Sequence, residues 1–226
     1  MLSDRDLIKE LVKTKNLAIH PLKLENINGS SINFTASANA WTVSDGKTAV
    51  FNNKISLPPG ETVSILTEEA LCVSNKISGT YHSRVSLSAK GLSNISTTLD
   101  PNWTGLSIIS LTNNSKDEQT IDVGKGIVTV TFDYLHRKST KSTITIAPSR
   151  SDIYSQFKLD DVQRAMLDNT EHKNPDSIKK NMKESDAYIY LKNATWGRKV
   201  KTFFAHPLVT AVLGGVAVYV VDKFWV

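Results

Sequence analysis

Between residues 27 and 147 the chain consists of short β-prone runs, each followed by residues that favour a turn. The runs are rich in Val, Ile, Thr and Phe and include SSINFTAS (30–37), TVSILTEEALCV (62–73), TGLSIISLT (104–112) and GIVTVTFDYL (126–135). The turn residues are SDG (44–46), PPG (58–60), NNS (113–115) and GKG (124–126). Many short strands at this spacing predict a closed sandwich or barrel. We therefore expect a mainly β fold, with residues 1–147 as one domain.

The first residues predict a helix with a defined start. Ser3 is placed to cap it, with Asp6 three residues on, and Leu2 and Leu7 are spaced for a hydrophobic staple. The apolar face of this helix is expected to consist of Leu7, Ile8, Leu11 and Val12. The pattern ends near Lys15, so the helix is expected to end there and to lead into the first strand.

Residues 148–201 form a polar region with helical periodicity. Two apolar stripes are visible, made of Leu159, Val162, Met166, Leu167, Ile178, Met182 and Ile189. The segment NTEHKNPD (169–176) separates them as a loop. Such helices are typical of packing or linker elements, and we assign 148–201 as a helical polar linker and C-terminal extension.

Residues 202–221 contain no Asp, Glu, Lys or Arg. As a helix these twenty residues would be roughly 30 Å long, the thickness of a bilayer core. The flank before them is basic, with Lys192, Arg198, Lys199 and Lys201. A basic flank tends to remain cytoplasmic, so we expect a C-terminal tail anchor with the domain on the cytoplasmic face of a membrane. Pro207 and the pair Gly214–Gly215 keep open the alternative of a buried helix or a Val-rich strand.

Composition and motif searches exclude several functional classes. A single cysteine, Cys72, rules out an internal disulfide and a Cys-rich zinc site. The five histidines are scattered without metal-ligand spacing, and no GxxxxGK[ST] phosphate loop is present. The net charge of +5 is too small to indicate a nucleic-acid partner by itself. We therefore expect neither a protein-held metal nor a nucleic-acid partner.

Three segments occur in the order and at the separations of a known superfamily. MLSDRDLIKELV (1–12) leads to NGSSINFTA (28–36), followed by SRVSLSAKGLSN (83–94) and TTLDPNWTGLSIISLTNNS (97–115). Together they resemble the dCTP deaminase and trimeric dUTPase superfamily, over about residues 1–136. The resemblance implies a dUTPase-like distorted β-barrel with an N-terminal helix. It also implies a homotrimer with its sites between subunits and a deoxynucleotide ligand, with Mg2+ accompanying the nucleotide.

The same resemblance implies a set of nucleotide-binding residues. Arg84 and Ser86 match positions that handle phosphates and water. The equal alternatives are that Arg84 pairs with an acid in a trimer interface and that Ser86 only forms a turn. Lys90 lies beside a lost phosphate ligand, or is simply solvated. Asp100 matches a dUTPase carboxylate that acts on the sugar and the attacking water, or caps the turn before Trp103. Trp103 itself is either a stacking platform or a core residue.

The departures from the superfamily pattern fall on its chemistry. Val85 replaces the first of two serines, and Ala89 replaces the second phosphate-binding arginine. Ser110 stands where the deaminases carry the glutamate that moves protons to and from the attacking water. Losing a general base costs on the order of 100- to 10,000-fold in rate. Asn33 replaces an aspartate that helps to hold magnesium in the dUTPases, and a neutral amide is a poorer ligand for that cation.

The sequence therefore leaves several functions open. One is a catalytically degenerate, membrane-anchored trimer that binds or senses a deoxynucleotide. Another is an active dCTP deaminase or dUTPase with a rearranged site in which Asp100 serves as the base. A third is a purely structural trimer.

Overall fold

The computed structural model describes residues 1–141 and 154–204, with side chains described as far as residue 195. Its first element is helix α1 (Asp4–Lys9), which continues as a π-helical turn, η1 (Glu10–Thr14). The expected capping box is present, because Ser3 Oγ accepts from the backbone N–H of Asp6 and the Asp6 carboxylate accepts from that of Ser3. The helix ends at Lys15, which adopts a left-handed conformation with φ 59°. The predicted start and end of this helix are both confirmed.

Most of the remaining chain up to residue 134 is β-structure. One sheet has the order β7-β9-β5-β2-β11-β6-β8, with β1 paired to β5. Its strands are β1 (Leu17–His20), β2 (Ser31–Thr42), β5 (Thr62–Val73), β6 (Ile77–Ser83), β7 (Leu92–Ser93), β8 (Thr97–Leu99), β9 (Thr104–Asn113) and β11 (Gly126–Tyr134). A smaller sheet contains β3 (Val50–Phe51), β4 (Lys54–Leu57) and β10 (Gln119–Asp122). Short helical turns η2 (Leu24–Asn26) and α2 (Val85–Ser88) lie between strands.

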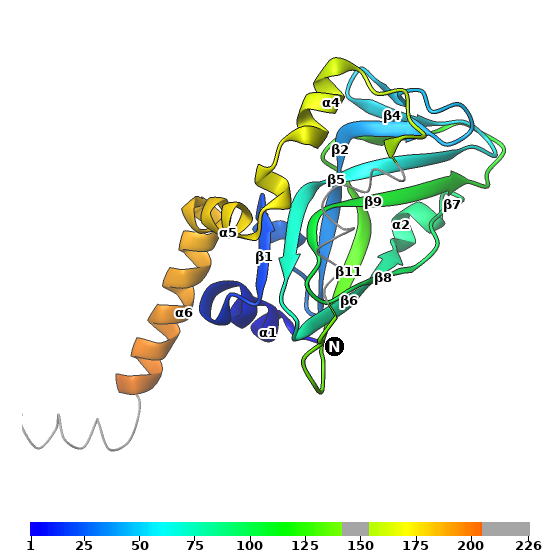
Figure 1. The fold of residues 1–226 in the computed structure, drawn as a ribbon. Helices are drawn as coiled ribbons and strands as arrows, with labels where there is room; N and C mark the ends of the chain where they lie inside the picture. The colour runs from blue at the N-terminus through cyan, green and yellow to red at the C-terminus, as the bar shows by residue number, and fades with distance from the viewer. Residues whose placement is uncertain (142–153, 205–226) are drawn as a thin grey trace, which may run out of the picture.

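The large sheet curls because its central strands are interrupted. The pairing of β2 with β5 shifts register between Ala36 and Ala40, and the pairing of β5 with β9 shifts between Leu66 and Ala70. In the second shift the extra residues lie in β5, and a bulge of this kind bends a strand and increases its twist. The bulge buries the Glu69 carboxylate, which accepts from the Thr35 backbone N–H and hydroxyl, each at 2.8 Å. The curled sheet encloses a core that includes Phe34, Ile65 and Phe132. The expected mainly β fold with an N-terminal helix and C-terminal helices is confirmed (Figure 1).

Residues 154–168, which we call the strap, cross the outer face of β2, β5 and β9. They contain helix α4 (Asp161–Asp168), capped by Asp160. Phe157 stacks on Trp41 with ring centroids 4.9 Å apart and an interplanar angle of 8°. Trp41 Nε1 donates to Gln163 Oε1 at 3.1 Å. These buried contacts form a second small core with Leu66 and Leu167.

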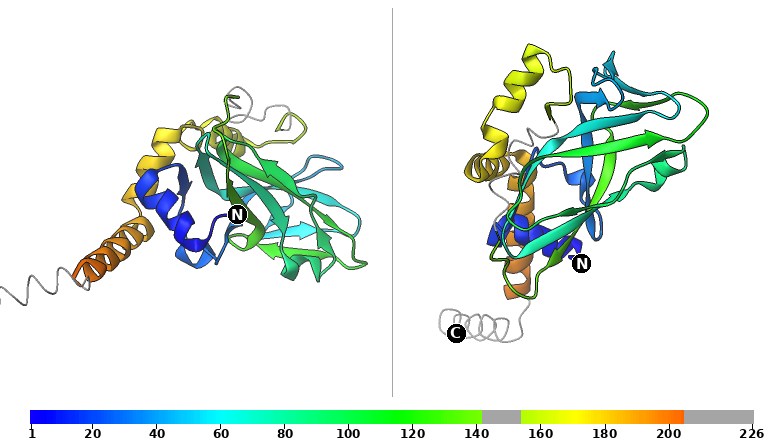
Figure 2. Two further views of the ribbon diagram at one scale, coloured as in Figure 1. Left: turned by 90° about the horizontal axis from the view of Figure 1, so that it is seen from below. Right: turned by 45° about the vertical axis from the view of Figure 1, so that its right-hand side comes forward.

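The remaining helices continue this packing. A 3-10 turn, η3 (Glu171–Lys173), precedes α5 (Pro175–Glu184), which lies on β1 and buries Ile178 and Met182 in the main core. Helix α6 (Asp186–Phe204) begins with buried Tyr188 and then runs away from the sheet (Figure 1 and Figure 2). The helical periodicity of 148–201 is thus observed in the described part, but a polar linker does not describe it. Leu167, Ile178 and Met182 of its apolar stripes pack in the two cores. The expected stripe residues Val162 and Ile189 are instead exposed.

No helix within the described ranges is both long and apolar enough to cross a membrane. Of the predicted tail at 202–221, residues 205–221 lie outside the described residues, and 202–204 form the end of α6.

Candidate functional site

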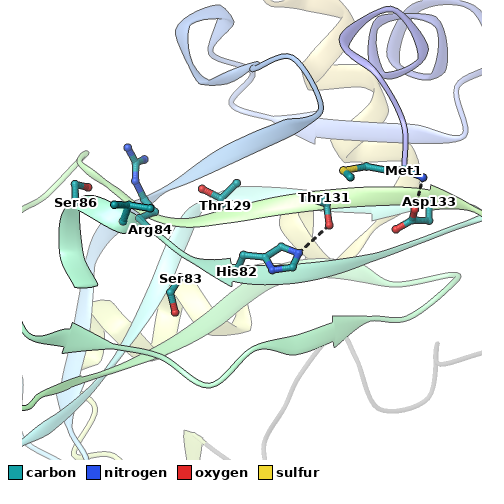
Figure 3. A pocket seen from close by; sticks show the side chains of 9 residues that line it. Met1, His82, Ser83, Arg84, Ser86, Thr129, Thr131 and Asp133 are labelled. Carbon is teal, nitrogen blue, oxygen red and sulfur yellow. Dashed lines mark hydrogen bonds and ion pairs between the residues drawn. The ribbon is translucent and has the colours of Figure 1, made fainter. Parts of the chain in front are cut away.

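A cavity of about 670 Å3 lies at the end of β6, against α2 and β11. Its lining carries Arg84, Ser86 and several polar or charged neighbours, namely His82, Ser83, Thr129, Thr131, Asp133 and Met1, together with Val85. Figure 3 shows Arg84 and Ser86 at one end of this pocket and the pair formed by Met1 and Asp133 at the other. The first pocket therefore gathers two of the predicted phosphate-binding residues.

Arg84 is a cation of this pocket that forms no ion pair in the described part of the chain. Asp133 is neutralised by the N-terminal amine of Met1 at 2.5 Å, and His82 Nε2 lies 3.0 Å from Thr131 Oγ1. No carboxylate among the described residues forms an ion pair with Arg84. The guanidinium rests against Gly126, where an added Cβ would lie 1.8 Å from Arg84 Nη1. A half-buried guanidinium with free donors is well suited to a phosphate or carboxylate group.

A second cavity, of about 410 Å3, contains two more of the predicted binding residues and Ser110. Asp100, Trp103 and Ser110 line it, with Tyr81, Thr97, Thr98, Leu99, Leu106, Ser107 and Ile108. The Asp100 side chain is exposed, while its backbone carbonyl accepts from the Trp103 N–H at 3.2 Å and closes the predicted turn. Trp103 is half-buried, and its indole N–H is buried without a hydrogen-bond partner in the described part of the chain. An unused buried donor and a row of hydroxyls give this pocket a polar character suited to a hydrogen-bonding ligand.

The hydroxyls of the second pocket are partly engaged with one another. The buried Tyr81 hydroxyl lies 2.7 Å from Ser107 Oγ, and burial raises the pKa of Tyr81. Ser110 Oγ lies 2.9 Å from Ser64 Oγ on the neighbouring strand β5. Asp100 is the only carboxylate in this lining. A hydroxyl paired with another hydroxyl has no useful basicity near neutral pH, so Ser110 cannot act as a general base.

The strap lies on the same sheet face as Ser110. Trp41 pairs with Ser64, and Ser64 pairs with Ser110, so all three side chains point to one side of the sheet. Leu106 and Ile108, which line the second pocket, also pack against the small core formed by the strap. The strap therefore lies on the same face of the sheet as these lining residues and packs against two of them.

The predicted residues do not gather into one site within a single chain. Arg84 and Ser86 line the first pocket, whereas Asp100 and Trp103 line the second, and Lys90 follows α2 and lines neither. The contact between Gly126 and the Arg84 guanidinium could not be predicted from the sequence. Gly126 lies in the GKG segment, where we recognised only a turn.

The described residues do not fit a protein-held magnesium ion. No group of three or more His, Cys, Asp or Glu side chains suitable for a metal occurs in the ranges described. At the position where the resembled dUTPases carry an aspartate, Asn33 Oδ1 accepts from the Thr129 hydroxyl at 2.8 Å. That hydrogen bond uses one lone pair of a neutral amide oxygen, which is already a poorer ligand for Mg2+ than a carboxylate.

No protein-family model matches the chain, and no curated protein matches it. Among solved structures, it is similar to the 2′-deoxycytidine 5′-triphosphate deaminase of Agrobacterium tumefaciens, with 14% identity and a TM-score of 0.49. That match covers 58% of this chain and 45% of the deaminase, so the chain spans less than half of that protein's length.

Two viral enzymes are similar as well. The EIAV dUTPase has 17% identity and a TM-score of 0.42 over 55% of this chain and 93% of that one. A mutant dUTPase from phage phi11 of S. aureus, which coordinates a structural Mg(II) ion, has 14% identity and a TM-score of 0.41 over 56% and 95%. These neighbours are thus a dCTP deaminase and dUTPases, and the likeness to them is one of fold.

Proposed function

We propose that this chain binds a deoxynucleotide, without deaminating it, at a site completed by trimer formation. The observation that carries the loss of deamination is Ser110. Its position is that of the general base in the resembled deaminases, yet its side chain is a hydroxyl bonded to Ser64. Neither serine can accept a proton from water at a useful rate near neutral pH.

Retained binding is supported by the charge of the first pocket. Arg84 has free donors and Ser86 offers an exposed hydroxyl beside it, which suits a phosphate chain. The second pocket offers hydrogen-bonding groups of a size suited to a sugar or base. Because the two pockets are separate in one chain, a complete site requires the Arg84 pocket of one subunit to meet the Asp100 pocket of the next. In this arrangement any Mg2+ would arrive on the nucleotide phosphates, since residues 1–141 and 154–204 offer no ligand set of their own.

The binding test uses the full chain with each dNTP and dNMP, with and without Mg2+, followed by thermal unfolding. A ligand at a hundred times its Kd should stabilise the fold by about 2.7 kcal/mol. Light scattering on the same sample should give a trimer, and a monomer at micromolar concentration would contradict the shared site. Stabilisation by no nucleotide would instead favour a purely structural trimer.

The activity test follows dCTP and dUTP by chromatography. We expect no dCTP deamination, and a turnover near 1 per second, within the ordinary enzyme range, would refute the proposal. The double variant Ser110→Glu with Ala89→Arg should gain measurable deamination if the scaffold is otherwise intact, whereas Ala89→Arg alone should not.

A second candidate is dUTP hydrolysis, favoured by one observation. Asp100 is an exposed carboxylate in the second pocket, so it remains available as a base for water. Pyrophosphate release from dUTP by the wild-type chain, together with its loss in Asp100→Asn, would establish this activity. Nucleotide binding without any pyrophosphate release would leave the non-catalytic function.

We further propose that residues 202–221 anchor the protein, with the domain on the cytoplasmic face of a membrane. The support is the sequence alone, namely twenty residues without a formal charge after a basic flank. The full chain should sediment with membranes, and deletion of 202–226 should release a folded domain. Leu213→Arg should also weaken membrane association, because a charge at the bilayer centre costs several kcal/mol, whereas Leu213→Ala should not. A full chain that is soluble without detergent would refute the anchor.

A further inference from the structure

A third cavity, of about 410 Å3, lies where η3 and α5 meet β1 and β5. Three lysines line it: Lys15, Lys173 and Lys179. The rest of the lining is polar or neutral and consists of Asn16, Cys72, Val73, Ser74, Asn75, Asn102, Thr104 and Pro175. The lining contains no carboxylate, so its formal charge is +3.

These lysines come from three separate elements that the fold holds in fixed positions. Lys15 ends the N-terminal helix in a left-handed conformation, and Lys173 belongs to η3. Lys179 follows Ile178, which is 1% exposed in the main core and fixes α5 on β1. The convergence is therefore a property of the tertiary structure and not of a flexible basic run.

None of the three lysines is neutralised within the described residues. Elsewhere in the molecule, Lys23 pairs with Glu68 at 2.6 Å and Lys47 pairs with Asp45 at 2.8 Å. Lys15, Lys173 and Lys179 form no such pair in the ranges described. The nearby Asp176 and Glu171 are exposed and do not line the cavity. Three like charges around one cavity repel each other, and an anion with more than one charge would relieve that repulsion.

We propose that this cavity binds a phosphate-bearing polyanion, at a site distinct from the two pockets of the proposed nucleotide site. Three ammonium groups match a ligand with two or more negative charges, such as a diphosphate group. The cavity is large enough for such a group together with part of the molecule that carries it. This chemistry is shared by soluble phosphate esters and by phospholipid headgroups, and the two sources are separated by the experiment below.

Cys72 provides a reporter inside the cavity. It is the only cysteine of the chain, lines the cavity and is 6% exposed. Burial raises the pKa of its thiol, and the Lys179 charge opposes that effect. An anion bound at the lysines would cover the thiol, and it would also offset the Lys179 charge, so that the thiol pKa rises further. Both effects slow the reaction of Cys72 with a neutral reagent such as iodoacetamide.

The experiment measures the alkylation rate of Cys72 in the full chain against pyrophosphate concentration, with KCl at matched ionic strength. We expect saturable protection by pyrophosphate and none by KCl. The double variant Lys173→Gln/Lys179→Gln should lose the protection, with about tenfold weaker affinity for each lysine removed, or ~1.4 kcal/mol each. The control Lys180→Gln/Lys183→Gln removes the same charge from exposed positions of α5 and should keep it.

Three comparisons complete the test. Arg84→Ala should keep the protection, because Arg84 lines a different cavity, so this site can succeed or fail independently of the nucleotide site. If vesicles that contain phosphatidic acid protect Cys72 and pyrophosphate does not, the bound phosphate belongs to a lipid headgroup. The absence of protection by either probe, or equal protection in the two lysine double variants, would overturn the proposal.

Discussion

Gly126→Ala separates the position of Arg84 from its charge. The three atoms nearest to an added Cβ are all in the Arg84 guanidinium, at 1.8, 2.8 and 3.6 Å. A separation of 1.8 Å is impossible, so the guanidinium must move away. It is the far end of a flexible side chain, so the surrounding fold can stay in place. The substitution therefore displaces the proposed phosphate ligand without removing it.

The expected magnitude follows from the interaction that is lost. A hydrogen bond to a charged group contributes about 1.5–3 kcal/mol, which corresponds to roughly 10- to 150-fold in Kd. Arg84→Ala should lose this whole amount. Gly126→Ala should lose part of it, because the displaced guanidinium still exerts an attraction over a longer distance. Calorimetry with the nucleotide that stabilises the wild-type chain would measure the two losses.

Gly29→Ala is the matched control for this prediction. An added Cβ at Gly29 would have no atom within 4 Å, so binding should remain at the wild-type level. Both glycine variants should unfold at or slightly above the wild-type temperature, because alanine restricts the unfolded chain. Wild-type affinity in Arg84→Ala would refute the role of Arg84 in binding. Wild-type affinity in Gly126→Ala alone would show that the observed position of the guanidinium is not the one that binds.

Three further predictions concern stability. Burial raises the pKa of Glu69 in the folded state, so stability should fall as pH rises above the ordinary value near 4.5. Glu69→Gln should flatten this slope in urea unfolding, and an unchanged slope would contradict the prediction. Phe157→Ala should remove the stack on Trp41 and destabilise the domain by about 3 kcal/mol. Phe51→Ala, at a side chain that is 74% exposed, should change the free energy of unfolding little. Equal effects of the two substitutions would refute the stabilising role of the strap. Ser3→Ala should lower the free energy of unfolding by about 1 kcal/mol, because the helix cap is lost. The same urea unfolding assay measures this change, and unchanged stability would show that the cap is dispensable.

Local features were predictable because they depend on neighbours in the sequence. The capping box at Ser3 needs only Asp6, three residues away, and the strand runs are marked by alternating side chains between turn residues. The turn before Trp103 follows in the same way from Asp100 and Pro101. The motifs also placed Arg84 beside Ser86 and Asp100 beside Trp103, because each pair belongs to one short segment.

What the sequence determined by itself is therefore the order and type of the elements and the loss of a carboxylate at Ser110. The tertiary structure decided which of these residues meet. It separated Arg84 from Asp100 into two cavities, excluded Lys90 from both, and packed Phe157 on Trp41 over more than a hundred residues of sequence. It also brought Lys15 to Lys173 and Lys179. Such contacts depend on strand register, on the bulge in β5 and on the docking of α5, and these are set by the packing of the whole core. A periodic pattern of side chains fixes which face of an element is buried, but it carries no information about the distant element that will cover that face.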